Sequence, residues 1–419
     1  MKAKLLPCLS LISLSISFAL GWADRPAWAA AAFGQTSSAT QASASAESKI
    51  EVENWTKPEA GWLYVLDAKP DAGAPGGRVW LVEPEAGKVM GSIRTGDNAD
   101  FALSPDGSRL YVASITRGDS SELAVIDTGR GVVVQRSTVD DREVGNVLPS
   151  FSTMAVSGDG LALRILRDTP KSAEADAFLL ATFDTQSGEF SQRTIHLGNC
   201  GPGRFISYPS ISHSSKDQFD ILCPRSNRIR LIRVDGESRE LQNEDIKLPW
   251  ERRVGAALAV EVPDNQEIAI VRGDGGVFKM NLVTHQFTDT VTRPVLANRI
   301  PPAAWPSSPD GSRVYVGFNK DYEKHYDNRF YLDYGRSPNL RPNDALAGEF
   351  HVFDMLTWRK VGTIKTKMPF WSAVIANDGK MLYAMAPQKH SILVIDTAKM
   401  REVRELKVGG APALALVAP

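Results

Sequence analysis

A strand-and-turn unit that recurs about every 50 residues limits how this chain can fold more than any other feature. An apolar residue followed by Asp, Glu or Asn precedes a turn seven times, at Val82-Glu83, Ile126-Asp127, Phe183-Asp184, Val234-Asp235, Met280-Asn281, Phe353-Asp354 and Ile395-Asp396. One small sheet cannot bury both of its faces, so repeats of this length stack around an axis. The sequence therefore predicts an all-β, seven-bladed β-propeller with four-stranded antiparallel blades.

A second marker of the repeat is an Asp-Gly turn between two strand-like runs. Clear copies stand at Ser104–Ser108, Ser308–Ser312 and Asn377–Lys380, and weaker ones at Ser157–Gly160 and Val262–Ile268. Glycine tolerates the positive φ that such turns require, and the flanking residues are β-branched and aromatic, as strands favour. These turns fit the short connections within blades.

The two ends of the repeat region are expected to meet. We place the propeller at residues 59–419, and the final apolar run Ala411–Val417 can pair with the blade that begins near Trp62. Such pairing would close the ring. Two β-sandwiches are the alternative architecture, and they fit the near-regular repeat less well.

The N-terminus has the pattern of a secretory signal peptide over residues 1–29. Lys2 and Lys4 precede an apolar run that is too short to span a membrane, and Ala27-Trp28-Ala29 resembles a cleavage site. An N-terminal helix of the folded domain is the alternative. Residues 30–58, which begin with a low-complexity stretch, are predicted to be a flexible tail. The mature protein is therefore expected to be periplasmic.

The charge balance argues against nucleic acid as a partner. The chain has 48 Lys+Arg against 49 Asp+Glu, a formal net charge of −1, and removal of the signal peptide makes it about −3. A nucleic-acid binder usually carries a basic surface, and a membrane-associated protein often carries a polybasic segment. We therefore expect neither nucleic-acid binding nor membrane insertion.

Two cysteines remain once the signal peptide and its Cys8 are removed, Cys200 and Cys223. An even number in an oxidising compartment favours a disulfide between them. Two buried free thiols are the alternative.

The chain lacks the motifs of a self-contained enzyme. It has no Cys-x-x-Cys-His, no Gly-x-x-x-x-Gly-Lys and no Gly-x-Ser-x-Gly, and its six histidines are scattered without metal-ligand spacing. We therefore predict no catalytic, cofactor-binding or metal-binding residues in this chain, which favours a scaffold or binding subunit.

One interval between blade markers, from Asn281 to Asp354, is 73 residues long because residues 319–348 form an insert. Long loops on rigid scaffolds often carry function, and tyrosine is enriched at binding hot spots. The insert is therefore a candidate partner surface, and a solvated loop folded over its own blade is the alternative. Its aromatic residues are Tyr322, Tyr326, Phe330, Tyr331 and Tyr334.

The segment Ile115–Asp127, which includes Arg117-Gly118, resembles the pattern Ile-x-Arg-Gly-x-x-(Ser/Thr)-(Asp/Glu)-x-x-x-(hydrophobic)-Asp of quinoprotein amine dehydrogenase heavy chains. The opening blade from Trp62, the cysteine pair and the stretch Phe318–Phe330 are also similar to that methylamine and aromatic amine dehydrogenase family. The resemblance covers most of the mature chain. It adds Arg117 to the candidate partner interface.

This resemblance implies a heavy subunit that binds no cofactor itself. Its partner would be a small disulfide-rich light chain carrying tryptophan tryptophylquinone, in an α2β2 heterotetramer. The assembly would oxidise a primary amine to an aldehyde and ammonia and pass electrons to a cupredoxin such as amicyanin or azurin. A stand-alone binding propeller of the YVTN type is the alternative from another class, and a propeller lactonase or other hydrolase is a third.

Overall fold

The computed structural model describes most of the chain after residue 49, all of it within the compact unit Glu47–Pro419. The described residues are 50–67, 77–116, 120–140, 153–168, 177–196, 210–212, 218–224, 228–236, 239–247, 258–261, 268–273, 276–281, 284–286, 291–292, 306–319, 347–357, 359–370 and 372–419. The signal peptide predicted at residues 1–29 lies outside them.

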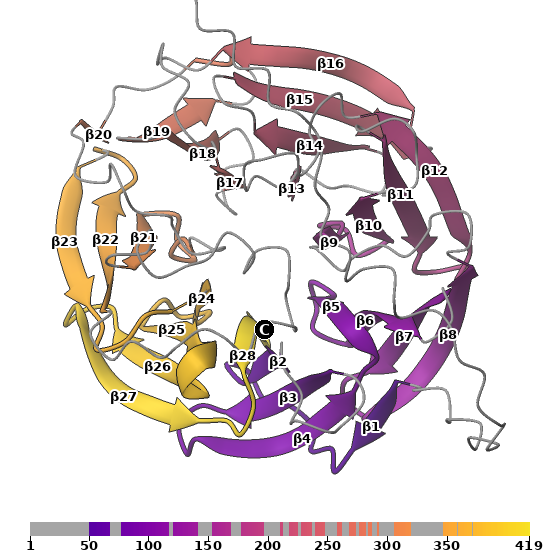
Figure 1. The fold of residues 1–419 in the computed structure, drawn as a ribbon, viewed down its shortest axis with the longest axis horizontal. Helices are drawn as coiled ribbons and strands as arrows, with labels where there is room; N and C mark the ends of the chain where they lie inside the picture. The colour runs from indigo at the N-terminus through magenta and orange to yellow at the C-terminus, as the bar shows by residue number, and fades with distance from the viewer. Residues whose placement is uncertain are drawn as a thin grey trace, which may run out of the picture. The chain divides into compact units, whose positions relative to one another are not determined.

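The strands of this unit form seven antiparallel sheets that succeed one another around a ring, with one strand of each sheet near the centre (Figure 1). The chain is therefore an all-β propeller, as the repeat predicts. We name the sheets A to G in the order in which they follow one another around the ring.

Sheet A contains, from the inside outward, β28 (Pro412–Val417), β2 (Leu63–Asp67), β3 (Arg78–Glu83), β4 (Lys88–Arg94) and β1 (Glu51–Glu53). Sheet B contains β5 (Asp97–Leu103), β6 (Arg109–Thr116), β7 (Ser120–Asp127) and β8 (Val132–Asp140). Sheet C contains β9 (Thr153–Val156), β10 (Ala162–Asp168), β11 (Ala177–Asp184) and β12 (Phe190–His196). Sheet D contains β13 (Ser210–Ser212), β14 (Gln218–Pro224), β15 (Arg228–Asp235) and β16 (Glu240–Lys247).

Sheet E contains β17 (Leu258–Glu261), β18 (Ile268–Gly273), β19 (Gly276–Asn281) and β20 (Val291–Thr292). Sheet F contains β21 (Arg313–Asn319), β22 (Gly348–Asp354) and β23 (Lys360–Lys365). Sheet G contains β24 (Ser372–Ile375), β25 (Met381–Ala386), β26 (Ser391–Asp396) and β27 (Arg401–Lys407). A short 3-10 helix, η3 (Pro387–Lys389), follows β25.

The expectation of seven four-stranded blades is met only in part. Six sheets have at least four strands, whereas sheet F has three in the described part of the chain. Where a fourth, innermost strand of sheet F is expected, there is a single bridge between Ser307 and Val314. Sheet A departs in the other direction, because β1 adds a fifth strand to a set of four that is already complete.

The seven apolar-polar pairs of the repeat each end one strand, in seven different sheets. In six sheets the polar residue is Asp or Asn, and its side chain accepts a backbone N–H of the turn that follows. Asp127, for example, accepts from Arg130 N at 3.0 Å and Asp396 from Lys399 N at 2.8 Å. Such side-chain capping stabilises a turn, which explains why the marker recurs.

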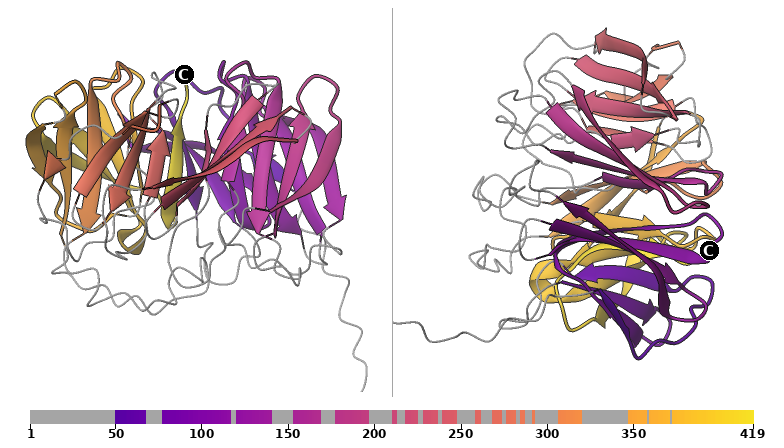
Figure 2. Two further views of the ribbon diagram at one scale, coloured as in Figure 1. Left: turned by 90° about the horizontal axis from the view of Figure 1, so that it is seen from above. Right: turned by 90° about the vertical axis from the view of Figure 1, so that its right-hand side faces the viewer.

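The Asp-Gly turns and these capped turns lie on one face of the ring, the turn face (Figure 2). Within sheets B, C and G a threonine hydroxyl joins the two turns: Thr128, Thr185 and Thr397 donate to the carbonyl oxygens of Gly107, Gly160 and Gly379 at 2.6–2.7 Å. We call the opposite face, where the remaining connections begin and end, the connection face.

Apolar side chains fill five of the spaces between neighbouring sheets in the described residues. Between sheets A and B, Tyr64, Leu81, Leu110 and Val112 are fully buried, and equivalent clusters separate B from C, C from D, F from G and G from A. The core is therefore a set of wedges between blades, as expected when each sheet buries both faces against its neighbours.

The predicted closure of the ring is confirmed. Strand β28 pairs antiparallel with β2, with Leu63 opposite Val417 and Val65 opposite Ala415. The Asp67 carboxylate accepts a hydrogen bond from Ala411 N at 2.8 Å, which fixes the start of β28. The first and last strands of the ring thus lie within one sheet.

The prediction of a flexible tail over residues 30–58 is wrong at its C-terminal end. Residues 50–58 belong to the folded unit: Ile50 is fully buried and β1 pairs with β4. The physical reason is that the two glutamates of β1 find arginines on sheet A, far along the sequence, so their polarity does not leave the segment in solvent.

Ending the chain at Ala411 should prevent stable folding, because it removes β28 and leaves the inner edge of β2 unpaired. We expect the free energy of unfolding in urea to fall by more than about 5 kcal/mol, which equals the whole stability of many domains. Removing only Pro419 retains every β2–β28 pair and is the matched control. Equal stability of the two truncated chains would contradict closure through β28.

Candidate functional site

The predicted partner-interface residues attach to one face of the ring. Arg117 falls between the end of β6 at Thr116 and the start of β7 at Ser120, and the aromatic insert falls between the end of β21 at Asn319 and the start of β22 at Gly348. All four of these strand ends lie on the connection face. Arg117, Tyr322, Tyr326, Phe330, Tyr331 and Tyr334 themselves lie outside the described residues.

The structure describes only one of the two cysteines of the predicted disulfide. Cys223 belongs to β14, opposite Arg230 of β15, whereas Cys200 lies outside the described part of the chain. The pairing of the two cysteines stays a prediction.

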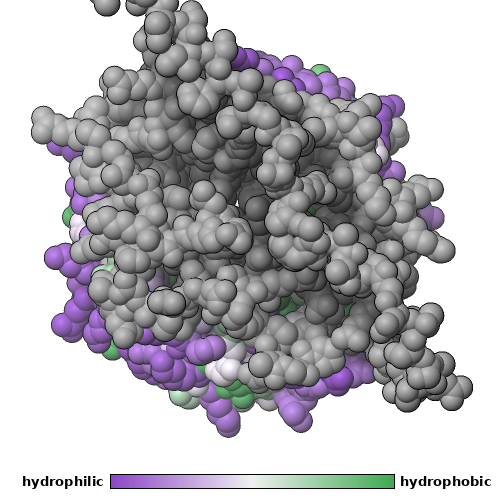
Figure 3. Space-filling model, in the orientation of Figure 1, coloured by the Kyte–Doolittle hydropathy of each residue, from purple (hydrophilic) through white to green (hydrophobic). Residues whose placement is uncertain are grey.

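Within the described ranges, no group of three or more His, Cys, Asp or Glu side chains is arranged to hold a metal ion. In the same residues, no helix has the length and apolar character needed to cross a membrane. The described rim of the connection face is mostly hydrophilic (Figure 3).

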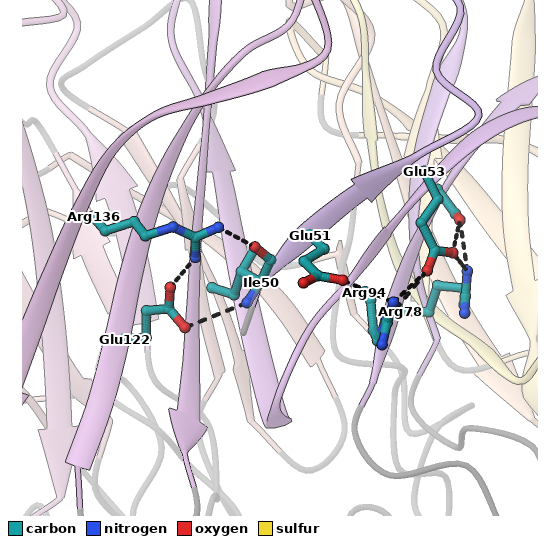
Figure 4. Close-up of polar contacts among 8 residues, drawn as sticks. Ile50, Glu51, Glu53, Arg78, Arg94, Glu122 and Arg136 are labelled. Carbon is teal, nitrogen blue, oxygen red and sulfur yellow. Dashed lines mark hydrogen bonds and ion pairs between the residues drawn. The ribbon is translucent and has the colours of Figure 1, made fainter. Parts of the chain in front are cut away.

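A network of polar contacts surrounds the segment Ile50–Trp55, which we call the strap (Figure 4). Strand β1 of the strap runs antiparallel to β4, with Glu51 opposite Arg94 and Glu53 opposite Ser92. The strap therefore begins at the connection face and runs toward the turn face along the outer edge of sheet A.

Two arginines of sheet A hold the acidic side chains of the strap. Arg94 pairs with Glu51 at 2.8 Å and with Glu53 at 2.9 Å, and Arg78 pairs with Glu53 at 2.5 Å. The hydrogen bond from Arg78, assisted by the charges of Arg78 and Arg94, lowers the pKa of Glu53 despite partial burial. Arg78 also lies over the Trp80 ring, 4.9 Å from its centre, and this contact restrains the guanidinium.

Two side chains of sheet B hold the beginning of the strap by contacting the backbone groups of Ile50. Ile50 N donates to Glu122 Oε2 at 3.4 Å, and Arg136 Nη2 donates to Ile50 O at 2.5 Å. Arg136 also pairs with Glu122, so the two side chains form one bridge around the Ile50 peptide groups (Figure 4). Glu122 is only 7% exposed, and burial strengthens such contacts.

Trp55 holds the other end of the strap. Its indole Nε1 donates to the carbonyl oxygen of Thr128 at 2.8 Å, and its ring stacks near Tyr64 with centroids 6.2 Å apart. Glycines make room for the ring: a Cβ on Gly91 would approach it at 3.1 Å, and one on Gly131 would overlap it. The strap is thus fixed to sheet A along its length and to sheet B at both ends.

Sequence reasoning missed this site. The signal was present in Glu51-Val52-Glu53, an alternation typical of a strand at an exposed edge, and in Trp55, a large aromatic residue that a solvated tail seldom needs. Arg78 and Arg94 could not be assigned to the strap, because they lie 25 to 43 residues away in the sequence and approach it only when β1 pairs with β4.

Comparisons with known proteins support the fold but assign the chain to no family. No family model matches the chain, and no curated protein matches it. A solved structure of a putative 6-phosphogluconolactonase from Bacteroides fragilis has a TM-score of 0.53 and 13% identity, over 87% of this chain and 99% of that one.

Two further solved structures have lower TM-scores. Hydrazine synthase from Kuenenia stuttgartiensis has a TM-score of 0.48 and 15% identity, over 75% of this chain and 87% of that one. Apo AztD from Citrobacter koseri also has a TM-score of 0.48, with 12% identity, over 85% and 97%. At these identities the similarity concerns the fold alone.

Replacing Gly131 by alanine should loosen the strap. Gly131 has φ of +64°, which alanine adopts at a cost, and the added Cβ would overlap the Trp55 ring. We expect a loss of about 1–3 kcal/mol in the free energy of unfolding, with a change in tryptophan fluorescence. Gly129→Ala is the control, since its Cβ would lie in ordinary contact with Asp127 at 3.5 Å. A similar loss in both variants would argue against the need for glycine at position 131 beside the Trp55 ring.

The stability that Glu53 provides should depend on pH. Its pKa is lower in the folded chain than its ordinary value of 4.5, so the contribution is complete above 4.5 and is lost as pH falls through the lowered folded pKa. Glu53→Gln should therefore reduce the free energy of unfolding by about 0.5–1 kcal/mol at pH 7 and flatten its decline below pH 4.5. Urea titrations across pH measure this, with Glu59→Gln, at an exposed position outside the strap, as the control.

Proposed function

We propose that this chain is the heavy, non-cofactor subunit of a periplasmic quinoprotein amine dehydrogenase, and that its connection face binds the light chain. One observation carries the proposal: the strands that flank Arg117 and the strands that flank the aromatic insert end on the same face. A single partner placed on that face could therefore contact both segments.

The division between the two faces supports this assignment. On the turn face the short connections are fixed by capping side chains and threonine hydroxyls, which leaves little freedom for a specific binding surface. Rigid scaffolds present binding residues on longer connections. Seven blades, one for each sheet and with three strands of sheet F in the described residues, would set these connections around one axis.

The proposed chemistry resides in the partner. A light chain carrying tryptophan tryptophylquinone would accept two electrons and two protons from a primary amine, and addition of water would release an aldehyde and ammonia. The electrons would then pass singly to a cupredoxin such as amicyanin or azurin. The role of this chain in the α2β2 assembly would be to bind and orient the light chain and to shape the approach of the amine.

A stand-alone periplasmic propeller of the YVTN type is the second candidate. The regularity of the capped turns favours it, because these turns need no partner to be stable. It requires that the connection face bind a ligand without a permanent light chain.

Purification of the untagged protein from its source separates the two candidates. As a heavy subunit, the chain should elute with a small subunit that shows quinone absorbance, and amine should bleach that absorbance. Arg117→Glu should weaken the association at least tenfold, because reversal of a charge that contacts the partner leaves the partner's group unpaired. Lys360→Glu, at an exposed position near the turn face, is the control. Elution as a lone monomer, without any quinone-bearing subunit, would overturn the heavy-chain assignment.

A further inference from the structure

We propose that the outer edge of sheet A is a peptide-binding site that this chain fills with its own strap. The ligand class is an extended acidic peptide of the pattern acid, aliphatic, acid, Asn or Gly, tryptophan, since the fourth residue has a positive φ. The occupant in the structure is Glu51-Val52-Glu53-Asn54-Trp55, preceded by Ile50. The proposal stands on the described contacts of the strap and does not depend on the proposed function.

The strap is additional to a complete blade. Strands β28, β2, β3 and β4 already give sheet A the four strands that a blade contains, and β1 joins them as a fifth, at the outside. Elsewhere in the described sheets the outermost strand carries no such addition. Addition of a short strand to an exposed sheet edge is a general mode of peptide recognition, in which the backbone supplies affinity and the side chains supply specificity.

Charge selects the acidic residues of this peptide. Residues 51 and 53 lie on the same side of the strand, as alternation requires, and both contact the Arg94 guanidinium, while Arg78 contacts residue 53 alone. Ser92 donates to the Glu53 carboxylate at 3.3 Å and accepts from Arg78 at 2.6 Å, which orients the arginine. A peptide with neutral or basic residues at these positions would leave the two arginines without these partners.

Shape selects the aromatic residue. Asn54 has φ of +49°, so the chain turns out of the strand direction immediately before Trp55. The turn directs the indole onto Gly91 and Gly131, where any larger residue than glycine would crowd or overlap it. The indole N–H then reaches the Thr128 carbonyl oxygen, a bond that phenylalanine could not make.

The bridge between Glu122 and Arg136 recognises backbone instead of a side chain. Glu122 and Arg136 contact only the N–H and the carbonyl oxygen of Ile50. The bridge would therefore accept any residue whose side chain fits the buried position. Ile50 and Val52 pack against the apolar cluster between sheets A and B. The site thus combines hydrogen bonds to the peptide backbone, apolar packing against the cluster between sheets A and B, two arginines and a place for an aromatic ring beside Gly91 and Gly131.

The test uses the full-length chain, with a recognition sequence for a site-specific protease inserted after the exposed Lys57. After the folded protein is cut, the fragment ending at Lys57 should stay bound at 50 mM salt during size exclusion. An excess of a fluorescent peptide spanning residues 48–57 should displace it, and 1 M salt should speed its release at least tenfold, since salt screens the arginine contacts.

Matched variants test the recognition itself. Arg94→Glu should weaken binding of the peptide at least tenfold, and a peptide carrying Glu51→Lys should bind this variant better than the unmodified peptide does. Lys88→Gln, on the same strand and near the turn face, should change neither value. A peptide with Trp55→Phe should bind more weakly to every variant.

Three results would overturn the proposal. Immediate loss of the fragment at both salt concentrations would show that only the covalent connection holds the strap. A fragment that no peptide exchanges, in wild type and Arg94→Glu alike, would be an integral strand of the fold. Loss of the native circular dichroism after cutting would show that the ring cannot remain folded without it.

Discussion

The pairing of β28 with β2 is the interaction on which the rest of the structure depends. Each sheet buries its faces against its two neighbours, so an open series of blades would expose an apolar face at both ends. Tyr64 and Val65 illustrate this, since Tyr64 packs toward sheet B while Val65 packs toward sheet G. Because β28 comes from the end of the chain and β2 from its beginning, one strand pair makes all the wedges between blades possible.

Further contacts of the two chain ends reinforce this closing sheet. After β28, Ala418 O accepts from Asn377 of sheet G, and Pro419 lies against Gly107 of sheet B. Before β2, the strap ties the outer edge of sheet A to Glu122, Arg136 and Thr128 of sheet B. The closing sheet is held by one strand pair at its inner edge and by ionic contacts at its outer edge, which differ in their response to salt and pH.

The parts of the fold that could be predicted from sequence are those whose interactions are local. Asp127 caps a turn that begins at Asp127 itself, so the same short pattern recurs wherever the same turn recurs. The strap could not be predicted in this way, because Glu53 depends on Arg78 of sheet A and Ile50 on Arg136 of sheet B. These arginines lie 25 and 86 residues away along the chain, and only the folded sheets bring them near the strap. That sheet F has only three strands in the described residues was likewise not predictable, since its marker at Asp354 belongs to a strand that is present.

The same distinction explains why the candidate partner surface is harder to derive than the fold. A capped turn has one favourable conformation, set by a carboxylate and the N–H groups two or three residues onward. The segments that contain Arg117 and Tyr331 are not copies of that repeated turn, so the repeat does not predict their contacts. In this propeller the repeat specifies the frame, and the segments at which the repeat is interrupted have to be derived from other evidence.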